Sequence, residues 1–151
     1  MTSAAPPATG PSGPGACQAA HLAGTLGQMN GTAGSVYYPL ILRNTGSSTC
    51  TMFGYPGVSY VASAGGSQIG APAARRVGTA HTISLAPGQS AQATLGITDA
   101  ANFTTACRIT PVSWLRVYPP AQTVPLYIPH KDQACANTTD VTLQVGPMVA
   151  G

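Results

Sequence analysis

The sequence predicts an all-β domain, an immunoglobulin-like antiparallel β-sandwich of seven to eight strands held by two disulfides. Short runs rich in β-branched and aromatic residues alternate with turns that contain Gly, Pro and Asn. No stretch keeps a helical period for more than about two turns. The chain of 151 residues also has four cysteines but only six Lys or Arg and three Asp or Glu.

The expected strands follow one another from Cys17 to the C-terminus. In chain order they cover residues 21–26, 36–43, 57–62, 81–85, 90–97, 112–118, 124–128 and 139–145. Alternation along a strand predicts which side chains share a face. The expected faces are Val58, Tyr60 and Ala62; Val112, Trp114, Arg116 and Tyr118, opposite Ser113, Leu115 and Val117; and buried Val141, Leu143 and Val145.

Glycine and proline mark the turns between these strands. Pro39 cannot donate a backbone hydrogen bond, which favours an edge position or a bulge within its strand. Pro56 followed by Gly57 is typical of a type II turn, and Ala-Pro-Gly-Gln at residues 86–89 predicts a second tight turn. Residues 99–103 favour a short helical turn between strands.

The four cysteines are expected to form Cys17–Cys50 and Cys107–Cys135 disulfides. Each pair brackets two apolar runs, and antiparallel pairing of those runs brings the flanking cysteines together. Each bridge closes a loop of about 30 residues, which contributes roughly 3.6 kcal/mol in the chain-entropy model. The spacing lacks the Cys-x-x-Cys pairs of zinc sites, and four buried thiols are the alternative.

The chain divides into a linker at residues 1–16 and one domain at residues 17–151. The linker contains no charge and is rich in Pro, Gly, Ser and Ala, which is typical of a flexible tether. It lacks the basic start and apolar stretch of a signal peptide, so we expect an export signal to have been removed and a possible lipid anchor to lie upstream. No apolar run reaches the roughly 18 residues of a membrane span. The expected location is extracellular or in the cell envelope, secreted or lipid-anchored.

Several segments together resemble a known family. They are Leu-Arg-Asn-Thr-Gly at residues 42–46, Cys-Thr-Met-Phe-Gly-Tyr-Pro-Gly-Val at 50–58, Leu-Ala-Pro-Gly-Gln-Ser-Ala at 85–91, and then Cys107 and Cys135. This pattern is similar to an actinobacterial family of exported domains of unknown function, whose members are commonly lipoproteins or secreted proteins. The resemblance implies a small disulfide-bonded β-sandwich and assigns no catalytic or ligand residue.

The composition argues against nucleic-acid binding and against most catalysis. A net charge of +3 is spread too thinly for a nucleic-acid footprint. Three aspartates and no glutamate make paired-carboxylate hydrolysis improbable, and neither a Gly-x-Ser-x-Gly elbow nor a phosphate-binding glycine loop is present. A Ser-His-Asp triad assembled in space stays open. The sequence therefore predicts a protein that is not an enzyme.

Soft metal ligands are present but not arranged as a site. They are His21, His81, His130, Met29, Met52 and Met148. No His lies two or four residues from another His or Met, so the spacing predicts no copper or zinc site and no cofactor. A metal or small-ligand carrier would need these side chains to converge in the fold.

Two loops are candidates for recognition of a partner. Residues 63–79 form a loop too long for a simple hairpin, and Arg75 and Arg76 within it suit a carboxylate or phosphate. Residues 118–130 are rich in proline and could hold Tyr118 or Tyr127 outward.

Tyr55 either caps the core beside the Cys50 disulfide or forms an exposed aromatic lip. The predicted function is an exported, non-catalytic binding or structural module for an unknown protein or envelope glycan. The alternative is an exported small-ligand or metal carrier. An exposed apolar or aromatic patch favours the binding module, and a cluster of His and Met favours the carrier.

Overall fold

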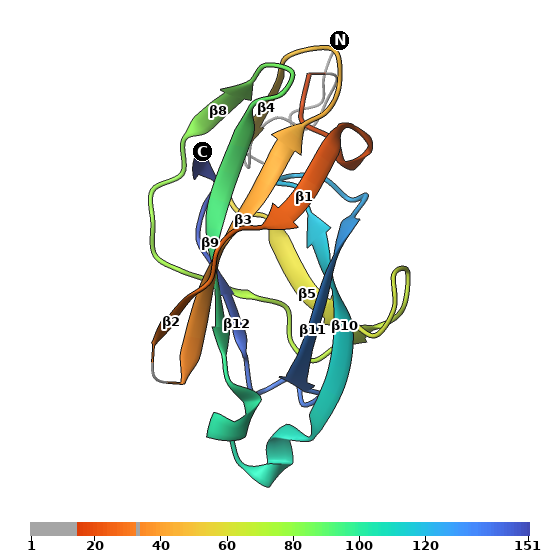
Figure 1. Cartoon of the computed structure of the whole chain (residues 1–151), viewed down its shortest axis with the longest axis vertical. Helices are drawn as coiled ribbons and strands as arrows, with labels where there is room; N and C mark the ends of the chain where they lie inside the picture. The colour runs from red at the N-terminus through yellow and green to blue at the C-terminus, as the bar shows by residue number, and fades with distance from the viewer. Residues whose placement is uncertain (1–14, 33) are drawn as a thin grey trace.

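Strand pairing produces two main sheets that face each other across a hydrophobic core (Figure 1). The computed structural model describes residues 15–32 and 34–151. Most of the expected linker, residues 1–14, lies outside the described residues. Its last two residues, Gly15 and Ala16, lie beside Thr51, whose backbone N–H donates to the Gly15 carbonyl.

The larger sheet has seven strands. Its main path is β1 (Leu22–Leu26), β3 (Ser35–Asn44), β9 (Ser90–Thr98), β12 (Leu143–Val145) and β7 (Ala74–Arg75). The short strands β2 (Asn30–Thr32) and β13 (Val149–Ala150) pair with β3 and β9. All of these pairings are antiparallel except β12 with β7.

The smaller elements complete the sandwich. A four-stranded sheet has the order β11 (Leu126–Cys135), β10 (Ile109–Tyr118), β5 (Gly57–Val61) and β6 (Gln68–Ile69). A third pair joins β4 (Cys50–Phe53) to β8 (Thr82–Leu85). The 3-10 turns are η1 (Ala19–His21), η2 (Ala100–Asn102) and η3 (Thr105–Cys107), and η2 confirms the short turn expected at residues 99–103.

The core lies between the inner faces of the two main sheets. The larger sheet contributes fully buried Leu40, Leu42 and Leu95, and the smaller sheet contributes Leu115 and Val117. These residues alternate with outward-facing neighbours along each strand, as a sandwich requires. The predicted all-β sandwich is therefore confirmed.

Both expected disulfides are present. Cys17 and Cys50 are joined with their Cα atoms 4.9 Å apart, and Cys107 and Cys135 with theirs 4.7 Å apart. The first bridge lies in the main core. The second forms a separate small cluster with Ala100. The two disulfides indicate an oxidising, non-cytoplasmic environment for the folded protein.

The expectation of an edge position at Pro39 is wrong, but a bulge-like irregularity lies opposite it, since residues 27–29 face only residues 38 and 39 between the Leu26–Leu40 and Asn30–Tyr37 pairs. Strand β3 pairs with β9 on one side and with β1 and β2 on the other. Pro39 lies opposite the interval between β1 and β2, where its carbonyl accepts a hydrogen bond from the Gly27 N–H. The ladder is interrupted there, so no backbone donor is required from proline.

The expected face of Val112 is also wrong. The register of β10 against β11 shifts between Val112 and Trp114, which is a β-bulge. Val112 is consequently buried in the core, whereas Trp114 faces outward. Alternation read from the sequence cannot detect an inserted residue of this kind.

Two further expectations about strand faces are partly wrong. Val58 and Tyr60 are buried as expected, but Ala62 is exposed beyond the end of β5. At the other end of the chain, β12 begins only at Leu143, and Val141 before it is half-buried. Both strands are therefore shorter than the runs of alternating apolar residues that predicted them.

The type II turn expected at Pro56 and Gly57 is absent. Gly57 has no positive φ and begins β5, while Gly54 has φ 105°. The second expected turn is present. Gly88 has φ 87°, and the Gln89 N–H donates to the Ala86 carbonyl over 2.9 Å, as a Pro-Gly type II turn requires.

Candidate functional site

The segment from residue 63 to residue 79 is a crossover between the two main sheets. It first pairs with β5 as β6 in the four-stranded sheet and then with β12 as β7 in the seven-stranded sheet. The Ala73 N–H donates to the Val58 carbonyl between these two pairings. The backbone therefore fixes Arg75 and Arg76 in place although both side chains are exposed.

Each of these arginines lies over a tyrosine ring. The guanidinium carbon of Arg75 is 4.8 Å from the centroid of the Tyr55 ring, and that of Arg76 is 5.2 Å from the centroid of the Tyr37 ring. The Tyr55 hydroxyl also donates to the Arg76 carbonyl. We call Tyr37, Tyr55, Arg75 and Arg76 the Arg–Tyr cluster. Stacking holds a guanidinium in a defined orientation while its N–H groups stay available in the plane.

Glycine makes room for one of these rings. Gly96 pairs with Tyr37 across β9 and β3, and a Cβ at Gly96 would lie 2.9 Å from the Tyr37 ring. The ring therefore lies over Gly96 on the outer face of the larger sheet. Tyr55, Arg75 and Arg76 could be predicted from the sequence, but Tyr37 could not, because only the crossover brings Arg76 to β3.

A shallow groove of about 360 Å³ borders the cluster on the same face. Its lining includes Asn30, Tyr37, Arg76, Val77, Thr94 and Val149. Val77 is fully exposed and Val149 is 40% exposed. We call this feature the outer groove. It combines an aromatic ring, a guanidinium and exposed aliphatic side chains, and no Asp, Glu or Lys is among its lining residues.

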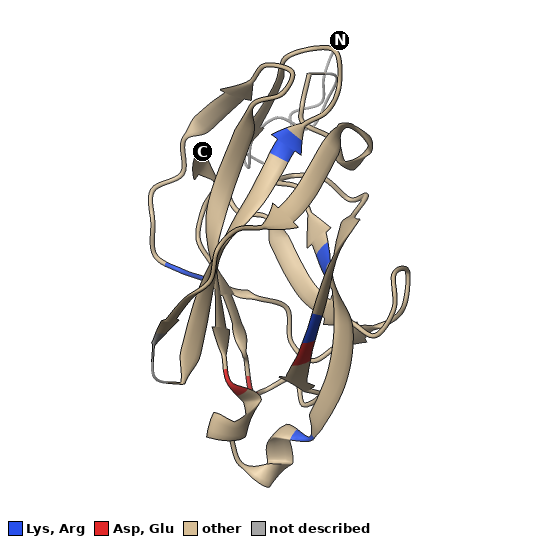
Figure 2. Cartoon of the chain, in the orientation of Figure 1, with Lys and Arg blue, Asp and Glu red and all other residues tan. Residues whose placement is uncertain are grey.

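The distribution of charge leaves the arginines without acidic partners. Figure 2 shows the aspartates only at the lower end of the sandwich, whereas basic residues are spread along its length. Asp99 caps η2, Asp132 bonds with His130, and Asp140 contacts Asn137. In the part of the chain that the structure describes, no arginine forms an ion pair with a carboxylate.

Tyr118 and Tyr127 belong to a different surface. Tyr118 lies at the end of β10 with the guanidinium of Arg116 5.2 Å from its ring centroid, and Tyr127 pairs with Arg116 across β11. Both rings are on the outer face of the four-stranded sheet. The five predicted partner-binding residues therefore do not form one surface: Tyr118 and Tyr127 lie apart from Arg75 and Arg76, and Tyr55 is half-buried and packs against the main core.

A polar network that the sequence did not predict lies between the sheets. The Tyr60 hydroxyl donates to Asp132 Oδ2 over 3.0 Å, and His130 Nε2 lies 3.2 Å from the same oxygen. The His130 ring also packs edge-on against Tyr38 of the opposite sheet, with ring centroids 5.4 Å apart. Alternation along β11 turns His130 and Asp132 inward together, and a His-x-Asp pair in a strand is the sequence signal for it.

The network sets the ionisation of its members. Burial raises the pKa of Tyr60 well above its usual value, and the Asp132 carboxylate raises it further. Burial alone would raise the pKa of Asp132, but hydrogen bonds from His130, the Gln133 backbone and Tyr60 outweigh it and lower this pKa below 3.8. Asp132 is therefore held as a carboxylate in the folded state.

The lowered pKa of Asp132 predicts a loss of stability in acid. A carboxyl whose pKa is lower in the folded state contributes stability above its unfolded pKa of about 3.9, and this contribution disappears as the pH falls through the folded pKa. The free energy of unfolding in urea, measured from pH 7 to pH 2.5, should fall more steeply below about pH 4 in the wild type than in Asp132→Asn. Coincident pH profiles for the two proteins would contradict this assignment.

The predicted soft ligands occupy separate environments. Met52 and Met148 are buried in the main core, Met29 is 50% exposed, and His130 belongs to the inter-sheet network. Within residues 15–32 and 34–151, no three His, Cys, Asp or Glu side chains are grouped so as to hold a metal ion.

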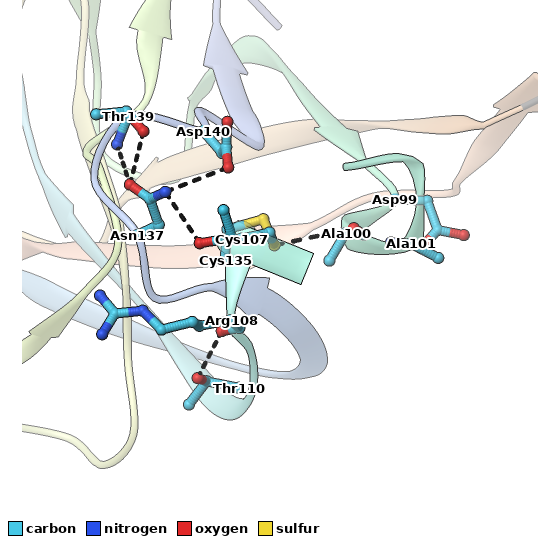
Figure 3. Close-up of a disulfide and its surroundings, with 11 residues drawn as sticks. Asp99, Ala100, Ala101, Cys107, Arg108, Thr110, Cys135, Asn137, Thr139 and Asp140 are labelled. Carbon is cyan, nitrogen blue, oxygen red and sulfur yellow. Dashed lines mark hydrogen bonds between the residues drawn. A yellow bond between two sulfur atoms is a disulfide. The ribbon is translucent and has the colours of Figure 1, made fainter. Parts of the chain in front are cut away.

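The second disulfide anchors the lower end of the sandwich. Figure 3 shows Cys107 bonded to Cys135, with the side chain of Asn137 beside them. The Asn137 side-chain amide donates to the Ala106 carbonyl over 3.0 Å, and its oxygen accepts from the Thr139 backbone N–H over 2.7 Å. These contacts stabilise the loop that follows β11. We therefore assign a structural role to Asn137 and this disulfide.

The fold and these surfaces define a disulfide-bonded β-sandwich domain with Arg- and Tyr-containing outer faces. No helix in the described ranges has the length and apolar character needed to cross a membrane. The chain belongs to the family described as Domain of unknown function (DUF4232), whose profile matches residues 17–149. Comparisons with curated proteins and with solved structures gave no significant match.

Proposed function

We propose that this domain is a non-catalytic binding module exported to the envelope or exterior of an actinobacterial cell, either secreted or lipid-anchored. It binds a protein partner through the outer groove and the Arg–Tyr cluster beside it. The cysteine pairs support an oxidising compartment, and the resemblance of residues 42–58 to exported domains supports this location.

One observation carries the choice of a protein partner. Val77 and Val149 expose aliphatic side chains within the same groove that contains Tyr37 and the stacked Arg76. Protein interfaces are enriched in aromatic residues and Arg at their centre and depleted in Lys, Glu and Asp. The lining of the outer groove has this composition, whereas a carrier site would need an enclosed cavity with converging polar ligands.

Site-specific crosslinking tests this proposal. A photoreactive benzophenone amino acid placed at Val77 or at Val149, in the protein expressed by its own cell, should yield the same discrete crosslinked protein. The control position is Ile109, which is also exposed, at 52%, but lies at the start of β10, outside the groove. Arg76→Ala in the Val77 probe background should weaken the product about tenfold, since a central arginine contributes 1–2 kcal/mol or more.

Two results would contradict the proposal. Either a product of equal yield from position 109, or different products from positions 77 and 149, would show that the groove is not the contact surface. Each probe protein should keep the unfolding midpoint of the wild type, so that a lost product is not caused by unfolding.

A further inference from the structure

The outer face of the four-stranded sheet carries three aromatic rings and one guanidinium. Trp114, Arg116 and Tyr118 alternate along β10, so all three point to the same side. Cross-strand pairing of Tyr127 with Arg116 adds a third ring to that side. We call Trp114, Arg116, Tyr118 and Tyr127 the aromatic face; all four side chains are partly exposed.

These rings do not serve to close the core. Leu115 and Val117, which alternate with them, have no exposed surface and form the inner face of the same strand. Gly57 of β5 pairs with Tyr118. Its missing side chain leaves room for the Tyr118 ring, since a Cβ at Gly57 would lie 3.5 Å from that ring. Trp114 lies beside Val61, which is fully buried, but all three rings keep part of their surface exposed on the outer side of the sheet, where flat rings can contact a ligand.

The guanidinium of Arg116 is oriented but its charge is not neutralised. One of its terminal nitrogens donates to Gln68 Oε1 over 2.6 Å, and its plane lies against the Tyr118 ring. Arg116 Nε is buried and has no hydrogen-bond partner within the described structure. Asp99, Asp132 and Asp140 are all engaged elsewhere. A carboxylate can therefore pair with the terminal N–H groups of this guanidinium, whereas the buried Nε is out of reach of an external anion.

We propose that the aromatic face binds an acidic oligosaccharide, a chain of sugars that carry carboxylates. Pyranose rings present flat C–H surfaces that pack on Trp114, Tyr118 and Tyr127, and a sugar carboxylate pairs with Arg116. Trp114 and Tyr118 are four residues apart on one strand, about 13 Å, so an extended ligand spans several sugar units. Three rings and a guanidinium on one face favour a saccharide over the protein partner assigned to the outer groove, whose lining exposes the aliphatic Val77 and Val149.

This inference does not depend on the proposed protein-binding function. The two surfaces lie on opposite outer faces of the sandwich, one on each main sheet. A domain with both could hold a partner protein on one side and an acidic glycan on the other.

The single tryptophan of the chain makes the test specific, because Trp114 lies within the proposed site. Its fluorescence should change saturably when the folded protein is titrated with a defined galacturonic acid hexamer. The fully methyl-esterified hexamer has the same sugars without the charge. It should bind at least about tenfold more weakly, as expected for loss of a charge-assisted hydrogen bond.

Variants on the two faces separate this site from the outer groove. Arg116→Gln and Tyr127→Ala should each weaken binding of the hexamer about tenfold or more. Tyr37→Ala, on the other outer face, should leave it unchanged. Circular dichroism and the unfolding midpoint check each fold, and if Arg116→Gln does not fold, the ester comparison and Tyr127→Ala still decide.

Three outcomes would overturn the proposal. The first is no fluorescence change with the acidic hexamer at millimolar concentration. The second is equal affinity for the ester or for dextran sulfate, which would indicate non-specific contact or general charge attraction. The third is an equal loss of binding in Tyr37→Ala, which would place the ligand on the other face.

Discussion

Replacing Asn44 with alanine should lower the free energy of unfolding by about 3 kcal/mol, because it removes three buried or partly buried hydrogen bonds at once. The side-chain amide donates to the carbonyls of Ser48 and Leu85 over 2.9 and 2.8 Å, and its oxygen accepts from the Gly46 N–H over 2.9 Å. Asn44 is only 1% exposed, so water cannot replace these partners. Urea unfolding at pH 7 measures the change.

Two variants sharpen this prediction. Asn44→Asp keeps the shape but directs a carboxylate oxygen at the two carbonyls, so it should destabilise at least as much as alanine at pH 7. Thr45→Ala, next in the chain and exposed, is the matched control and should change stability by less than about 0.5 kcal/mol. A loss below about 1 kcal/mol in Asn44→Ala would show that this contact network is not a determinant of the fold.

The double substitution Cys17→Ala/Cys50→Ala should destabilise the domain by about 3.7 kcal/mol in the chain-entropy model, because it frees a loop closed over a sequence separation of 33. The bridge joins the start of the domain to β4 within the main core, so two buried sulfur atoms are lost as well. The unfolding midpoint of the purified variant, compared with that of the wild type under non-reducing conditions, reports this loss.

The second bridge supplies the comparison. Cys107→Ala/Cys135→Ala opens a separation of 28 and should cost a similar amount by the entropy term. It lies in a small separate cluster, so the main core around Cys17 should stay intact. If neither double variant moves the midpoint, and reduction of the wild type does not either, the disulfides contribute nothing to stability and the argument from loop closure is wrong.

The cysteine pairing and most strands could be predicted because they depend on local patterns. Apolar runs bracketed by Cys17 and Cys50, and by Cys107 and Cys135, placed each cysteine pair at the ends of antiparallel runs. The turn at Gly88 followed from proline and glycine preferences alone. The type II turn predicted at Gly57 is absent, because the residue with positive φ is Gly54, three positions earlier.

The candidate surfaces could be predicted only in part. Arg75, Arg76 and Tyr55 stood out as residue types, but the partner of Arg76 is Tyr37, which lies 39 positions away in the chain on β3. That contact depends on the parallel pairing of β7 with β12, which no local pattern encodes. Similarly, the register shift near Val112 turns this side chain inward, although alternation had placed it on the same face as Trp114, Arg116 and Tyr118.

The sequence by itself determined the class of fold, the two disulfides and the shortage of acidic groups, since composition, alternation and spacing are properties of the chain. Only the tertiary structure decided where the few charged side chains lie. It placed Arg76 and Arg116 on opposite outer faces and turned His130 and Asp132 into the space between the sheets. The physical reason is that strand register and crossover are set by packing of the whole core, so contacts between distant residues follow from the assembled sheets.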